Sequence, residues 1–193
     1  MSTIAIVQKN QEICIASESL TTFGTLKLNE DFSANPDKIF PWGDSYVGMV
    51  GMVSIHMVLR DIAEKETESP DFSSVSSIYQ YFTKLHADLK EKYFLNPKED
   101  DDDPVESSQF LIAIVNKHGM FGVHSLREVH PYKKFWAYGS GKRYALGAMH
   151  AVFDREEFDA EAIARAGIQA GITFDDGSGG TIRSFKVKMD KPL

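Results

Sequence analysis

The first residue of the chain that could do chemistry is Ser2, a hydroxyl residue directly behind Met1. If Met1 is removed, Ser2 carries both a hydroxyl group and a free α-amine. An α-amine has a pKa of about 8 and can act as a base near neutral pH. An amine beside a hydroxyl is one established way to activate a weak nucleophile. Ser2 could therefore supply both the nucleophile and the base of a hydrolytic reaction, although many proteins begin with Met-Ser.

The hydrophobic pattern predicts the elements that must position Ser2. A strand at residues 3–8 follows it and forms a hairpin with residues 12–17 across a short polar turn. Further strands are predicted at residues 25–28, 38–42, 45–50, 110–115, 119–124, 135–139 and 181–188. Helices are predicted at residues 53–66, 74–94, 143–153 and 159–173, with N-caps at Ser73 or Ser74 and near Asp159.

The order of these elements predicts the fold class. Strands, two helices, strands, two helices and a strand favour an α+β protein with two packed antiparallel sheets and helix pairs outside them, a four-layer αββα sandwich. We expect a single domain over residues 1–193, because no repeat or flexible linker divides the chain. Periodicity also predicts two inward faces. The first helix would bury Val53, Ile55, Met57, Val58, Leu59 and Ile62, and the last strand Ile182, Phe185 and Val187.

Composition excludes several classes of function. The net charge of −7 argues against a general nucleic-acid binder, because phosphate binding needs a basic face. No apolar run is long enough to cross a bilayer, and the start of the chain is expected to be the first strand rather than a secretory signal. The one cysteine, Cys14, excludes an internal disulfide, and the six scattered histidines lack the spacing of metal ligands, so no metal site is expected. No cofactor is expected. We expect a cytoplasmic protein.

Five short segments, in order, carry a resemblance to a known family. They are STIAIV at 2–7, IASES at 15–19, DKI at 37–39, YGSG at 138–141 and DDGSGG at 175–180. With them the chain resembles a proteasome β-type subunit of the N-terminal-nucleophile hydrolases over nearly its whole length. The resemblance is greatest to the bacterial homologues, including the peptidase subunit of the bacterial two-component ATP-dependent protease. The αββα fold of the family agrees with the element order above.

The resemblance implies a nucleophile and the groups that activate it. Ser2 matches the position of the family's nucleophile, usually a threonine, and would attack a peptide carbonyl to form an ester. Lys38 matches a buried lysine whose ammonium would favour the attacking form of the nucleophile. Glu18 stands where the family has an aspartate paired with that lysine. Gly51 matches the glycine whose backbone N–H donates to the oxyanion.

The resemblance also implies groups around the terminal amine and the substrate. Asp175 and Ser178 match the acid and the serine that hydrogen-bond there, and Ser140 matches another polar group beside them. Met49 aligns with the base of the pocket for the residue before the cut, which favours apolar side chains. Thr22 is the second substrate-binding position implied in this way.

Each of these residues also has a plain structural interpretation. Lys38 could be a surface lysine at a strand start, and Glu18 an exposed residue after a strand. The YGSG and DDGSGG segments could be only tight, polar turns.

The chain also departs from the pattern of the family. Ser2 lacks the methyl group of threonine, and Glu18 adds a methylene that could re-aim Lys38. A retained Met1 would convert the amine into an amide and remove the base.

Three functions follow from the resemblance. The first is a self-compartmentalising peptidase that hydrolyses unfolded polypeptides, assembles into stacked rings and works with an ATPase unfoldase. The second is a catalytically inactive scaffold subunit of such a ring. The third, for which the chain is short, is an amidohydrolase acting on a small molecule. Tyr79, Tyr81 and Tyr93 are expected to be exposed and available to neighbouring subunits.

Overall fold

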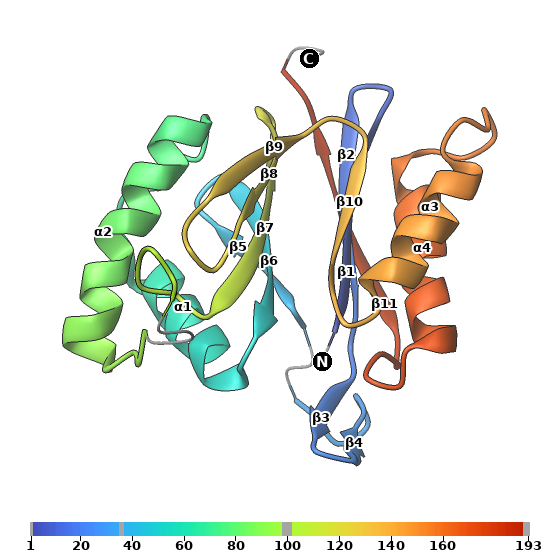
Figure 1. Cartoon of the computed structure of the whole chain (residues 1–193). Helices are drawn as coiled ribbons and strands as arrows, with labels where there is room; N and C mark the ends of the chain where they lie inside the picture. Colours follow the sequence, from blue (N-terminus) through green and yellow to red (C-terminus); the bar gives the residue numbers. More distant parts are fainter. Residues whose placement is uncertain (1, 35–36, 98–101, 191–193) are drawn as a thin grey trace.

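Two β-sheets packed face to face form the centre of this computed structural model, which describes residues 2–34, 37–97 and 102–190 (Figure 1). Within those ranges the first sheet has the strand order β10-β1-β2-β11 and the second β5-β6-β7-β8-β9. Neighbouring strands in both sheets are antiparallel. The first sheet comprises Thr3–Lys9 (β1), Glu12–Glu18 (β2), Phe135–Gly139 (β10) and Ile182–Lys188 (β11). The second comprises Ile39–Trp42 (β5), Ser45–Gly51 (β6), Phe110–Asn116 (β7), Gly119–Val123 (β8) and Val129–Tyr132 (β9), and a separate hairpin comprises Thr21–Phe23 (β3) and Leu26–Leu28 (β4).

Helices cover the outer face of each sheet. Figure 1 shows α1 (Val53–Lys65) and α2 (Val75–Tyr93) outside the second sheet, and α3 (Lys142–Val152) and α4 (Ala160–Phe174) outside the first. Ser74 caps α2 by accepting from the Ser77 N–H, and Asp159 caps α4 by accepting from the Ala162 N–H. The four-layer αββα sandwich predicted from the sequence is confirmed.

The central strands β1 and β2 are buried on both faces, and side-chain size differs between the faces. Large isoleucines, such as Ile4 and Ile15, fill the space between the two sheets. Small side chains, such as Ala5 and Ala16, face α3 and α4. Small residues on that face let α4 approach β1 closely, which brings the end of α4 to the start of the chain.

Two short strands, β3 and β9, differ from the sequence-based prediction. β9 was not predicted; it contains Pro131, which cannot donate to a ladder, and it lies at the edge of its sheet with β8 as its neighbour. β3 was also not predicted, because its three residues carry no detectable alternation.

Two predicted faces were partly wrong. In α1, Leu59 is buried and Ile55, Val58 and Ile62 pack against the core, whereas Val53 and Met57 are exposed. In β11, Phe185 and Val187 pack between the sheets, whereas Ile182 packs under the helices. Residues separated by an odd number of positions point to opposite sides of a strand, so Ile182 and Phe185 could not share a face.

The predicted exposure of three tyrosines is confirmed for Tyr79 alone. The ring of Tyr81 packs edge-on against Trp42 and Phe72, and its hydroxyl donates to Glu66. Tyr93 packs against the core beneath α1 and α2. These two tyrosines therefore stabilise the helix layer of their own chain.

Candidate active site

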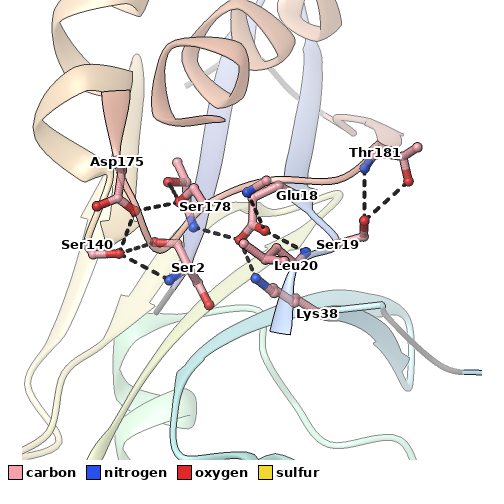
Figure 2. A network of polar contacts seen from close by, with 11 residues as sticks. Ser2, Glu18, Ser19, Leu20, Lys38, Ser140, Asp175, Ser178 and Thr181 are labelled. Atoms are coloured by element: carbon pink, nitrogen blue, oxygen red, sulfur yellow. Dashed lines mark hydrogen bonds and ion pairs between the residues drawn. The ribbon is translucent and has the colours of Figure 1, made fainter. Parts of the chain in front are cut away.

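The backbone of Ser2 is clamped by the YGSG turn at the end of β10. Ser2 N–H donates to Ser140 Oγ at 3.3 Å, and the Ser2 carbonyl accepts from the Gly141 N–H at 3.4 Å and lies 3.4 Å from Ser140 Oγ (Figure 2). Gly139 has φ +91°, and a Cβ there would lie 1.9 Å from the Ser2 carbonyl oxygen. Glycine at 139 is therefore required for the clamp to close on Ser2.

The carboxylate of Asp175 lies one hydrogen bond behind this clamp. Asp175 follows the last residue of α4, and its Oδ2 accepts from both Ser140 Oγ and Ser178 Oγ at 2.7 Å. Figure 2 shows Asp175 and Ser140 on one side of Ser2. A carboxylate linked to the Ser2 nitrogen through one hydroxyl favours positive charge on that nitrogen.

The Lys38–Glu18 ion pair lies on the other side of Ser2 (Figure 2). Both side chains are buried, and Lys38 Nζ donates to Glu18 Oε1. Burial lowers the pKa of the Lys38 ammonium below its ordinary value, while the Glu18 carboxylate acts in the opposite direction. Lys38 is therefore easier to deprotonate than a surface lysine.

Glu18 binds four donors, which answers the concern that its extra methylene could re-aim Lys38. Oε1 accepts from the Thr3 N–H at 3.1 Å as well as from Lys38. Oε2 accepts from the Leu20 N–H at 2.8 Å and from the Gly179 N–H at 3.3 Å. The longer side chain thus fits its surroundings and keeps the ion pair with Lys38.

A cavity of about 110 Å³ opens beside this network. Ser2 and Lys38 both line it, so the predicted nucleophile and the lysine share one space. The three predicted substrate and oxyanion positions, Thr22, Met49 and Gly51, also line it. The remaining lining residues are Leu20, Thr21, Asp37, Val53 and His56.

Comparison with solved structures identifies the family. Thiobacillus denitrificans BPH in complex with epoxomicin is 40% identical to this chain, with a TM-score of 0.91 over 98% of this chain and 100% of that chain. The chain belongs to the proteasome β-type family of N-terminal-nucleophile hydrolases. A second structure of Thiobacillus denitrificans BPH gives the same identity and TM-score over 97% of this proteasome-like chain and 98% of the other.

The proteasome-like fold extends to more distant proteins. Eukaryotic HslV from Trypanosoma brucei shares 19% identity, with a TM-score of 0.71 over 96% of this chain and 99% of that chain. At this identity the likeness shows the fold alone. A scan against protein-family models and a search of curated proteins find no match.

The structure of this proteasome-like chain brings all the site residues predicted from the sequence together. Six of them, Ser2, Glu18, Lys38, Ser140, Asp175 and Ser178, lie in the polar network, and the other three line the cavity. Met1, whose removal the predicted chemistry requires, lies outside the described residues.

Thr3 and His56 also belong to the site, and neither was predicted from the sequence. Thr3 Oγ1 is fully buried and lies 2.7 Å from Ser178 Oγ. Strand alternation could have revealed it, because Thr3 shares the buried face of Ala5 and needs a partner there. His56 lines the cavity from α1, and burial together with the Arg60 charge lowers its pKa to about 4. No local pattern marks a helical histidine as a cavity residue.

Among the residues that the structure describes, no group of three or more His, Cys, Asp or Glu side chains is placed to hold a metal ion. The helices of the described ranges include none that is long and apolar enough to cross a membrane.

Proposed function

We propose that this proteasome-like chain is a peptidase that hydrolyses unfolded polypeptides with Ser2 as its nucleophile after removal of Met1. The observation that carries the proposal is the position of Ser2 between two polar arms beside a cavity. One arm runs through Ser140 to Asp175, and the other is the Lys38–Glu18 pair. Scattered surface residues would not gather in this way around one residue and one cavity.

The first half of the reaction forms an ester. Ser2 Oγ attacks the carbonyl carbon of the scissile peptide while its proton passes to the α-amine. The Asp175 carboxylate, acting through Ser140, stabilises the ammonium that results. The Gly51 N–H is the proposed donor to the oxyanion, which a cavity lined by both Gly51 and Ser2 permits.

Breakdown of the tetrahedral intermediate completes the ester, and hydrolysis of that ester in the second half regenerates the enzyme. The ammonium gives its proton to the leaving amine as the C–N bond breaks, and the new amino terminus departs. Water then attacks the ester and loses its proton to the α-amine, and the Ser2 hydroxyl is released with its proton restored. Lys38 lowers the energy of negative charge on Ser2 Oγ in both halves.

The direct test compares Ser2→Ala with the chain whose mature terminus is Ser2. We expect hydrolysis of fluorogenic peptides to fall to background in Ser2→Ala, because this variant lacks the Oγ atom that attacks the peptide carbonyl. Ser2→Thr is the matched control and should retain activity, since it keeps the hydroxyl and adds a methyl group. Undiminished hydrolysis by Ser2→Ala would refute the proposed nucleophile.

The scaffold alternative now rests on Met1 alone, since Glu18 keeps its ion pair. Intact-mass spectrometry of untagged protein separates the two functions. A mass that includes Met1 favours the scaffold, because the Ser2 nitrogen would then be an amide without a basic lone pair. A mass that lacks Met1 favours the peptidase.

We also propose that copies of the chain assemble into stacked rings in the cytoplasm and receive substrates from an ATPase unfoldase. Large apolar side chains are exposed on the β3–β4 hairpin and on α1, including Phe23, Leu26 and Met57. Sedimentation at micromolar concentration should show a large oligomer, which Leu26→Glu should weaken. Sedimentation as a monomer would contradict the proposed ring, and without a ring no unfoldase would be needed to deliver substrates.

A further inference from the structure

Thr3 connects the two arms of the site from inside the protein, one through its backbone N–H and the other through its hydroxyl. Thr3 is completely buried, and its N–H donates to Glu18 Oε1, the oxygen that also accepts from Lys38. Its side-chain Oγ1 lies 2.7 Å from Ser178 Oγ, which in turn donates to Asp175. One residue next to the nucleophile therefore contacts both the Lys38–Glu18 pair and the Asp175 arm.

The direction of these hydrogen bonds follows from counting protons. A carboxylate can only accept, so the single hydroxyl proton of Ser178 is used on Asp175 Oδ2. Ser178 Oγ must then accept from Thr3, and Thr3 is the donor of their shared bond. The chain runs from Thr3 to Ser178 to Asp175, while Ser140 donates to the same Oδ2 from the side of Ser2.

Two glycines leave room for the Thr3 hydroxyl. A Cβ at Gly141 would lie 2.0 Å from Thr3 Oγ1, and a Cβ at Gly171 would lie 2.6 Å from it. Gly141 has φ −81°, which any residue can adopt, so the need for glycine there comes from space and not from backbone conformation. The backbone at Gly141 and Gly171 therefore packs closely around Thr3 Oγ1 and fixes its position.

We propose that Thr3 is a positioning residue that sets how strongly the Asp175 arm stabilises a proton on the Ser2 amine, an inference that rests on the proposed function. Donation from Thr3 makes Ser178 a stronger donor to Asp175, because hydrogen bonds in a chain polarise one another. The Asp175 carboxylate then has less negative charge available to stabilise an ammonium at Ser2. The amine is thereby kept unprotonated at neutral pH, as a base must be.

The sign of the effect can be tested with Thr3→Val, which keeps the shape of the side chain and removes the donor. Without that donor Ser178 becomes a weaker partner of Asp175, and the Ser2 ammonium gains stability. We expect the pKa of the Ser2 α-amine to rise by a few tenths of a unit to about one unit. The acid limb of the kcat/KM profile should move to higher pH by the same amount.

The experiment uses ¹⁵N-serine-labelled protein without Met1 and follows the Ser2 amine by NMR across pH. Thr3→Ser keeps a donor and should restore the original pKa, and Thr173→Val, an exposed threonine on α4, should leave it unchanged. An unchanged amine pKa in folded Thr3→Val, or a Thr3→Ser that behaves like Thr3→Val, would overturn the proposal.

A second variant tests the same route if Thr3→Val does not fold, and the titration separates this proposal from the proposed function. If Thr3→Val does not fold, Ser178→Ala removes the middle of the chain and should raise the amine pKa in the same direction; a fall, or no change, would count against the proposed route. The amine titration needs no turnover. A chain that lacks peptidase activity but shows the Thr3 effect would therefore refute the proposed function while supporting the role of Thr3.

Discussion

At the scale of single residues, Glu18 determines how the lysine of the site is presented. It is a fully buried carboxylate whose two oxygens accept four hydrogen bonds, from Lys38 Nζ and three backbone N–H groups. A buried charge is tolerated when it is paired and its remaining lone pairs are satisfied, and both conditions hold here. The length of the Glu18 side chain therefore lets its carboxylate reach from β2 both to Lys38, directly before β5, and to the loop at Gly179.

Glu18→Asp tests this match directly. Shortening the side chain by one methylene withdraws the carboxylate by about 1.5 Å, so it cannot reach all four donors. We expect kcat/KM for peptide hydrolysis to fall by about 10- to 100-fold, since a displacement of this size misplaces Lys38. Glu18→Gln keeps the length but loses the charge and should also be impaired. Equal activity of Glu18→Asp would contradict the match in length, and higher activity would show that the glutamate is a handicap.

At the scale of elements, the contact between α4 and β1 depends on glycine inside a helix. Gly171 lies in the last turn of α4, where alanine would be better for the helix by about 1 kcal/mol. A Cβ there would lie between 2.6 and 3.0 Å from the side-chain atoms of Thr3. The helix gives up stability at this position so that it can lie against the first residue of β1.

Gly171→Ala and Gly147→Ala form a matched pair for this contact. Gly147 lies in α3, and a Cβ there meets nothing within 4 Å, so Gly147→Ala should stabilise the protein by about 0.5–1 kcal/mol. Gly171→Ala should instead destabilise it by about 1–3 kcal/mol and reduce hydrolysis, because Thr3 must move. Urea unfolding and peptide turnover measure both effects. Stabilisation by Gly171→Ala would mean that α4 and β1 separate easily.

Most elements could be predicted from the sequence, because their signals are local. The hairpin of β1 and β2 shows apolar runs about a polar turn, and Ser74 and Asp159 mark helix starts. β9 could not be predicted, since its four residues include a proline and its pairing partner decides its conformation. Thr3 and His56 were missed for a related reason. Their roles come from neighbours more than 100 residues away, or from the shape of a cavity.

At the scale of the whole molecule, the layered structure places titratable groups where water is scarce. His56 on α1 is partly buried, and its ring packs edge-on against Phe40 of β5. Burial is the largest cause of the lowered pKa of His56, His86 and His124. Each of these groups binds a proton more weakly in the folded chain than in the unfolded chain. Folding and proton uptake at these histidines therefore oppose each other.

This opposition predicts loss of stability in acid, and His56 gives the clearest window. Its pKa falls from 6.5 to about 4 on folding, so the unfolded chain binds more protons between these values. The contribution of His56 is present above pH 6.5 and is lost as the pH falls through 4, a change of up to about 3 kcal/mol. Urea unfolding at pH 7 and pH 4.5 should show a smaller decrease in stability for His56→Phe than for the natural chain. His150→Phe, an exposed site on α3, is the control and should follow the natural chain. If the free energy of unfolding decreases equally in His56→Phe and in the natural chain, protonation of His56 does not destabilise the folded state.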